Sequence, residues 1–146
     1  MTPGTILFDP NFQFKDGQLG EKLYVVLNDG SCGIYIGVKT TSNGNRHGIQ
    51  HGCQVLERFP NFMLAKGCCC LSKTTWVQLD AFFEFQSGAL IEKVMTGQIN
   101  RIGTLSDDLT RELLTCTTHA EDMTISQDEI IQAAVAAYLP TNETSD

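Results

Sequence analysis

The segment that most constrains the fold of this chain is residues 75–85, where apolar and polar side chains alternate. A period of two indicates a long, half-buried β-strand, because successive strand side chains point to opposite faces. The apolar positions that share one parity are Val77, Leu79, Ala81, Phe83 and Phe85, and the polar positions of the other parity are Gln78, Asp80 and Glu84. We therefore expect Val77, Leu79, Phe83 and Phe85 to point into the core.

Further strands are predicted on both sides of this segment. Residues 21–29 and 32–41 alternate in the same way, and Asp29-Gly30 between them is typical of a hairpin turn. Shorter strands are predicted at 5–9, 53–59, 62–65 and 89–95. Two polar, glycine-containing segments, 10–20 and 41–52, are expected to be loops, and loops on a rigid scaffold often carry function. Many short strands with frequent turns favour a mainly β barrel or sandwich.

Helices are predicted only near the end of the chain. Residues 104–116 have acids in the first turn and a leucine stripe, and residues 126–139 open with a capping box over 126–129 and end before Pro140. The expected organisation is a barrel with its terminal helix over 1–118, an additional helix over 119–139 and a disordered tail over 140–146.

Charge and hydropathy restrict the partners. The formal net charge of the 146 residues is -7 and the pI is about 4.8, so the surface repels polyanions on average and nucleic acid would need a local basic groove. No apolar run approaches the roughly 20 residues of a membrane helix, and the first residues lack the basic and apolar regions of a signal peptide. We therefore expect a cytoplasmic protein with no membrane contact.

The six cysteines allow two interpretations. Because the chain is expected in the cytosol, and Cys68, Cys69 and Cys70 are consecutive, we predict six free thiols and no metal or cofactor. The alternative is a structural zinc site formed by His47, His51 and Cys53 with the three consecutive cysteines, although their spacing matches no standard zinc module. A cysteine nucleophile paired with His47, His51 or His119 is a weaker alternative.

Several segments resemble the MazF/PemK toxin family. The opening Pro3-Gly4-Thr5-Ile6-Leu7-Phe8 is similar to the first strand of the family, and 21–28 (EKLYVVLN) takes the place of its second strand. The end of a strand at 38–42 (VKTTS), the later strand at 75–80 (TWVQLD) and the start of a helix at 101–107 (RIGTLSD) also resemble family segments. The resemblance covers residues 3–116 and implies a small SH3-like barrel with C-terminal helices.

The resemblance also implies an activity and a site. Members of the family act in toxin-antitoxin systems and cleave single-stranded RNA without a metal, with a cation stabilising the charge on the phosphate and a hydroxyl or acid moving the proton. Carried over to this chain, the catalytic residues are Lys22, Thr40, Thr41 and Asp80. The binding residues are Lys39, Arg46, His47 and Gln78. Glu21 and Gln78 stand where the family has arginines. The implied partners are single-stranded RNA, an antitoxin protein and a second copy of the chain.

An alternative function stays open at this point. The chain could be a non-catalytic SH3-like barrel that binds a protein or nucleic-acid partner. Thr40, Thr41 and Ser42 also fit a strand end that enters a turn, and Asp80 also fits the solvated face of a strand, because Gln78 and Glu84 share its parity.

Overall fold

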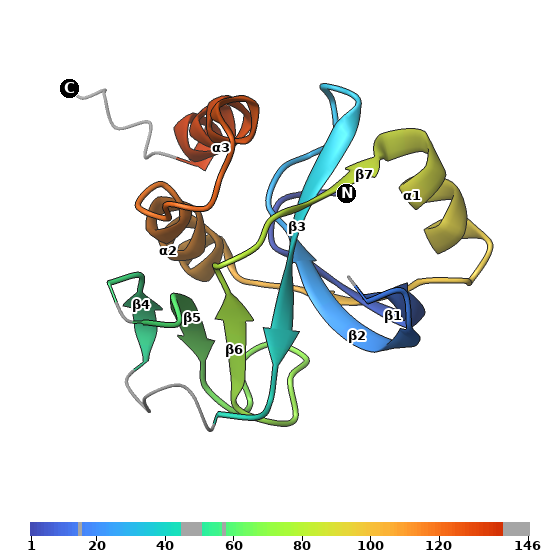
Figure 1. The fold of residues 1–146 in the computed structure, drawn as a ribbon, viewed down its shortest axis with the longest axis horizontal. Coiled ribbons are helices and arrows are strands. Elements are labelled where there is room, and N and C mark those ends of the chain that lie inside the picture. Colours follow the sequence, from blue (N-terminus) through green and yellow to red (C-terminus); the bar gives the residue numbers. More distant parts are fainter. Residues whose placement is uncertain (15, 45–50, 57, 139–146) are drawn as a thin grey trace.

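The computed structural model describes residues 1–14, 16–44, 51–56 and 58–138. Within these residues the protein is mainly β, with an eight-strand antiparallel sheet and three helices toward the C-terminus (Figure 1). In chain order the elements are β1 (Thr5–Gln13), β2 (Leu19–Val26), β3 (Ile34–Thr41), β4 (Gly52–Gln54), β5 (Asn61–Leu64), β6 (Thr75–Gln78), β7 (Phe83–Gln86), α1 (Ser87–Met95), β8 (Asn100–Thr104), α2 (Asp107–Thr117) and α3 (Ile125–Tyr138).

The strands follow the order β4-β5-β6-β3-β2-β1-β8, and β7 pairs with β3 beside this path. Strand β3 is central because its first half pairs with β7 and its last residues pair with β6. In Figure 1, β3 runs through the middle of the molecule, with α2 and α3 on one side and α1 on the other. Among the described strands no pairing joins β4 to β8, the two ends of the path.

The sheet buries apolar side chains in two separate clusters. The first core gathers side chains from the sheet and from α2 and α3; its fully buried members include Val25, Val38, Leu79, Leu113 and Ile131. The second core lies where α1 contributes Leu90, and it includes Leu7, Phe12, Tyr24, Val26, Tyr35 and Ile99. Tyr24 and Val25 are neighbours in β2 but belong to different cores, as strand alternation requires.

The expected strand over 75–85 is interrupted, and this corrects the prediction of one inward row. Strand β6 ends at Gln78 and β7 begins at Phe83. Val77 and Leu79 are fully buried in the first core, as predicted, whereas Phe83 and Phe85 are half-buried and pack against the second core. Because of this break, Phe83 and Phe85 contact a different core from Val77 and Leu79. The reason is that β6 and β7 pair with different parts of β3.

The expected strand at 89–95 is wrong, because these residues form α1. The Gln86 side chain caps this helix by accepting a hydrogen bond from the Ala89 amide at 2.7 Å. The expected loop at 10–20 is mostly strand, because β1 extends to Gln13 and β2 begins at Leu19. The expected strand at 53–59 shortens to β4, and β8 is a strand that periodicity did not indicate.

Both predicted C-terminal helices are present, with small changes at their starts. Helix α2 begins after Ser106, whose hydroxyl accepts from the Leu109 amide. The capping box of α3 lies two residues before the predicted one. The Gln127 amide donates to the Thr124 hydroxyl, and the Thr124 amide donates to the Gln127 side chain. Residues 140–146 lie outside the described part of the chain.

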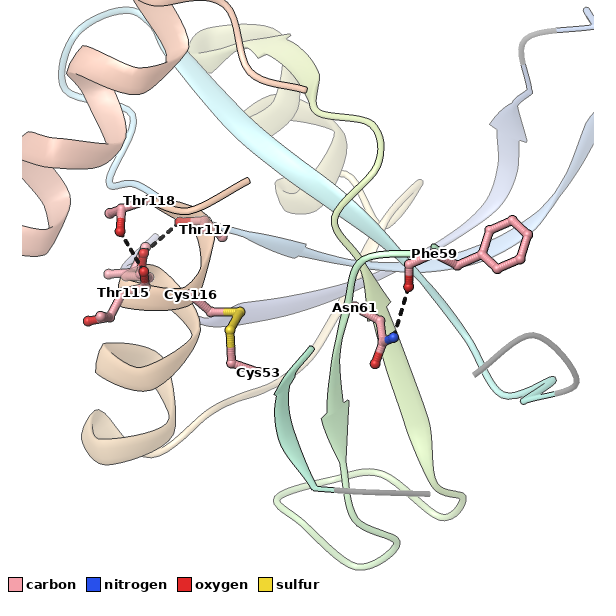
Figure 2. The surroundings of a disulfide bond; sticks show 8 residues. Cys53, Phe59, Asn61, Thr115, Cys116, Thr117 and Thr118 are labelled. Carbon is pink, nitrogen blue, oxygen red and sulfur yellow. Dashed lines mark hydrogen bonds between the residues drawn. A yellow bond between two sulfur atoms is a disulfide. The ribbon is translucent and has the colours of Figure 1, made fainter. Parts of the chain in front are cut away.

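The prediction of six free thiols is wrong. Cys53 in β4 and Cys116 in α2 form a disulfide, with their Cα atoms 5.6 Å apart, and Figure 2 shows the bond crossing from the strand to the helix. The two cysteines are 63 residues apart, so they become neighbours only when the helix packs beside the short strand. The other four, Cys32, Cys68, Cys69 and Cys70, are free. Disulfides are typical of oxidising compartments, so the cytoplasmic location stays a prediction.

Asn61 of β5 lies near the disulfide and holds the turn that precedes β5. Its side-chain amide donates a hydrogen bond to the Phe59 carbonyl at 2.9 Å, and the side chain is almost fully buried (Figure 2).

In the described ranges of the chain, none of the helices combines the length and the apolar character needed to cross a membrane.

Candidate functional site

Strand register divides the predicted site residues between the two faces of the sheet. Tyr24 pairs with Lys39, so Lys22 lies across from Thr41 on the same face. Thr40 pairs with Val77, which brings Gln78 beside Lys39. Four of the predicted residues, Lys22, Lys39, Thr41 and Gln78, therefore lie on the face that carries the second core.

One of the two lysines of this face, Lys39, lies between aromatic rings. The Lys39 ammonium is 5.3 Å from the centre of the Phe83 ring and 5.9 Å from that of Phe14, which is within range of a cation–π attraction. Both rings are half-buried, and both contact Phe12, with ring centres 5.5 Å and 5.6 Å apart. We call the set Lys22, Lys39, Phe14 and Phe83 the lysine–aromatic surface.

The two lysines of this surface form no close ion pair with any described residue, although Asp9 is the cross-strand partner of Lys22. Partial burial, and then the charge of Lys39, lower the pKa of Lys22 below its usual value. Among the described residues the single ion pair within 4 Å joins Arg111 to Asp108 on α2, so neither lysine pairs with a carboxylate there within that distance. An anion bound between the two ammonium groups would relieve their repulsion and raise the pKa of Lys22.

Thr40 alternates to the other face of β3, although it lines one cleft with Lys22 and Thr41. Its hydroxyl donates to the Leu23 carbonyl at 3.0 Å, and the side chain is 5% exposed. This hydroxyl therefore has a structural role in joining β3 to β2. Thr40 lines a cleft of about 300 Å³ together with Glu21 and Ser42. The other lining residues are Phe8, Lys22, Leu23, Thr41, Asn43 and Thr75.

One predicted catalytic residue, Asp80, is not gathered with the lysines. Asp80 is exposed in the connection between β6 and β7 and does not line the cleft. The Thr41 hydroxyl is half-buried and accepts a hydrogen bond from the Asn43 amide at 3.1 Å. Arg46 and His47 lie outside the described residues.

The zinc alternative loses its central ligand, because Cys53 is part of the disulfide. Within the described residues no group of three histidine, cysteine or acidic side chains is arranged to hold a metal ion. His51 is exposed, and its ring lies 6.5 Å from that of Phe62. The described side chains therefore offer no zinc site, and His47 lies outside the described residues.

Sequence reasoning missed the aromatic half of this surface. Periodicity places Phe14 in a loop and Phe83 in the core that holds Leu79. The signal that could have found them is the two phenylalanine pairs, at 12 and 14 and at 83 and 85, but their proximity to Lys39 depends on the pairing of β7 with β3.

Tyr24 is a buried polar group at the border of this surface. Its side chain is 1% exposed, its ring stacks on Phe85 with centres 5.1 Å apart, and its hydroxyl has no hydrogen-bond partner among the described residues. Burial, and then the charge of Asp9, raise the pKa of Tyr24 far above its usual value, so this side chain is neutral at physiological pH.

Replacing Tyr24 by phenylalanine is expected to stabilise the protein. A buried hydroxyl without a partner costs about 1–3 kcal/mol, and Tyr24→Phe removes it while keeping the ring and its stacking. Urea unfolding should show a higher midpoint. Tyr35→Phe is the matched control, because the Tyr35 oxygen accepts a hydrogen bond from the N-terminal ammonium at 2.8 Å, and its loss should lower the midpoint. A lower midpoint for Tyr24→Phe would mean that the hydroxyl has a partner.

Comparison of the sequence with protein-family models and with curated proteins found no match.

Proposed function

We propose that this protein binds single-stranded RNA on the lysine–aromatic surface. The observation that carries the proposal is the position of the Lys39 ammonium over two phenylalanine rings, next to a second lysine, Lys22, that forms no ion pair within 4 Å among the described residues. Single-stranded nucleic acids are bound by this combination, in which cations follow the phosphates and aromatic rings stack on the bases.

Each part of the surface has a role in this proposal. Lys22 and Lys39 bind one or two backbone phosphates, which offsets the repulsion between the two ammonium groups. Phe14 and Phe83 provide ring faces for a base. Thr41 and Gln78 lie beside the lysines on the same face and carry groups that can hydrogen-bond a ribose hydroxyl or a base edge. A 2′-hydroxyl contact of this kind would favour RNA over DNA.

The acidic composition gives the proposal a clear consequence for affinity. With a formal net charge of -7, most of the surface repels RNA, so binding depends on a small number of phosphate contacts. Such binding is expected to be weak and to fall with salt along a shallow slope, of about -0.7 per phosphate for a single strand.

The test is fluorescence anisotropy with a labelled single-stranded RNA over a salt series. Lys39→Ala should weaken binding of all sequences and reduce the salt slope by about 0.7, because one phosphate contact is lost. Phe14→Leu keeps an apolar side chain but removes the ring face, so it should weaken binding by about 1–3 kcal/mol without changing the slope.

Lys66→Ala is the matched control, because Lys66 is exposed on the turn between β5 and β6 and its loss changes the net charge equally. If Lys39→Ala and Lys66→Ala weaken binding to the same extent, RNA responds only to the overall charge and the proposed surface is wrong. If the wild-type protein binds no RNA at low salt, the function itself is wrong.

The second candidate is a metal-independent endoribonuclease of the MazF/PemK type, with the SH3-like barrel that the resemblance implies. It is favoured by the lowered pKa of Lys22, since lysines with lowered pKa values are often suited to proton transfer or to stabilising charge on a phosphate. In this version an antitoxin protein and a second copy of the chain are partners. The same RNA analysed on a denaturing gel distinguishes the candidates: fragments that disappear in Lys22→Ala support the enzyme, and intact bound RNA supports the binder.

A further inference from the structure

Three consecutive cysteines lie on the turn between β5 and β6, and the backbone holds this turn in place. The Gly67 amide donates to the Leu71 carbonyl and the Cys68 amide donates to the Ala65 carbonyl, both at 3.0 Å. Leu71 at the end of the turn is buried in the first core. Cys69 and Cys70 are nevertheless exposed, so the turn presents two thiols at a defined position on the surface.

Cys69 has an unusual backbone conformation. Its φ of 54° is the single positive value outside glycine in the described part of the chain, and this region costs a residue with a Cβ about 1–2 kcal/mol. Adjacent side chains of an extended chain point in opposite directions, which would keep the two thiols apart. The left-handed conformation of Cys69 removes this restriction, and strain of this kind is often found at functional positions.

The two sulfur atoms lie over the same glycine of β8. A Cβ added at Gly103 would be 2.6 Å from the Cys70 sulfur and 3.1 Å from the Cys69 sulfur, so both thiols pack directly on this backbone. The Cys69 thiol also donates to the Thr104 carbonyl at 3.1 Å. Because one small space holds both atoms, the sulfurs are close neighbours.

The ionisation of the pair supports this proximity. Burial, followed by the hydrogen bond and charge of the Cys69 thiol, raises the pKa of Cys70 to about 11. Cys68 is half-buried against the first core, and burial, followed by the charge of Cys69, raises its pKa. Cys69 therefore interacts with both of its neighbours, and Cys70 shares both its exposure and its close approach to Gly103.

We propose that Cys69 and Cys70 are a redox-active dithiol, which a small-molecule disulfide such as oxidised glutathione converts to a disulfide between the two adjacent residues. In the first step the Cys69 thiolate attacks the small disulfide, forms a mixed disulfide and releases one thiolate, which takes up the proton that Cys69 lost. In the second step Cys70 loses its proton and attacks the Cys69 sulfur, which releases the second small thiol. The dithiol loses two electrons and two protons, and the small disulfide gains them.

The test treats the folded, unreduced protein with oxidised glutathione and maps the products by mass spectrometry. The peptide that holds Cys69 and Cys70 should lose two hydrogens and carry no glutathione. Cys32 provides a comparison within the same molecule, because it is an exposed free thiol on the separate turn between β2 and β3. It should retain one glutathione, since no neighbouring thiol displaces it.

Two variants test the pairing directly. Cys70→Ser should abolish the loss of two hydrogens and leave one glutathione on Cys69. Gly103→Ala places a methyl group where the sulfurs lie, so ring closure should slow by about tenfold or more. Phenylarsine oxide, which links two neighbouring thiols with loss of water, should protect the wild-type pair from glutathione and should not protect Cys70→Ser.

The proposal is overturned if Cys69 and Cys70 each keep a glutathione, or if neither reacts while Cys32 does. It is equally overturned if the mapped product joins Cys68 to either of them, or if the pair exchanges with the bond between Cys53 and Cys116.

Discussion

Breaking the disulfide between Cys53 and Cys116 is expected to reduce the free energy of unfolding by about 4 kcal/mol, the value for a closed loop of this length. The bond ties β4, a three-residue strand that pairs only with β5 among the described strands, to the buried face of α2. Without it the unfolded chain gains freedom, and β4 is no longer tied covalently to α2. Urea unfolding of Cys53→Ser should show this loss.

Cys32→Ser is the matched control, because it removes an exposed thiol that takes no part in a disulfide. Its unfolding midpoint should equal that of the wild type, and adding a reductant should destabilise the wild type but not Cys53→Ser. Alkylation of the native, unreduced protein should label four of the six cysteines. Labelling of all six, with equal midpoints for wild type and Cys53→Ser, would show that the protein contains no such bond.

Leu79→Ala is expected to cost about 2–5 kcal/mol, and Phe83→Ala should cost less despite its larger side chain. Leu79 is fully buried in the first core, whereas Phe83 is half-buried beside the second core. The cavity left by Leu79 therefore has packed atoms on all sides, and the space left by Phe83 is open to water on one side. The two variants are compared by urea unfolding.

Leu56→Ala gives the baseline for a leucine without packing, since Leu56 is 98% exposed, and it should change stability by no more than about 0.5 kcal/mol. The same three variants connect stability to function. Phe83→Ala should also weaken RNA binding, while Leu79→Ala should leave the affinity of the folded protein unchanged. A larger loss of stability for Phe83→Ala than for Leu79→Ala would contradict the division into two cores.

Local patterns predicted much of the secondary structure. The alternation in β2 and β3, the turn at Asp29-Gly30 and the helical spacing of α2 and α3 all correspond to elements of the fold. These signals are local, because a strand or helix with one buried face must repeat its apolar residues at its own period. Local patterns misled at 89–95, where a short apolar run suits both a strand and a helix, and the capping side chain of Gln86 selects the helix.

In the candidate site, too, some residues could be predicted from the sequence and others could not. The resemblance to MazF/PemK segments points to Lys22 and Thr41, and register alone brings Lys39 and Gln78 to the same face. The same alternation puts Thr40 and Thr41 on opposite faces of β3, although both match the hydroxyl position that the resemblance implies. Asp80 could not be placed by periodicity, because the strand to which it was assigned ends at Gln78.

The sequence by itself determined the mainly β character of the chain, most strand and helix positions, and the acidic charge. Only the tertiary structure decided which distant residues meet: Lys39 with Phe14 and Phe83, Cys53 with Cys116, and Cys69 and Cys70 with Gly103. The physical reason is that periodicity reports which side of an element is buried, whereas contacts between elements depend on strand order, register and single backbone conformations. The positive φ of Cys69 and the division of β3 between β6 and β7 are such features.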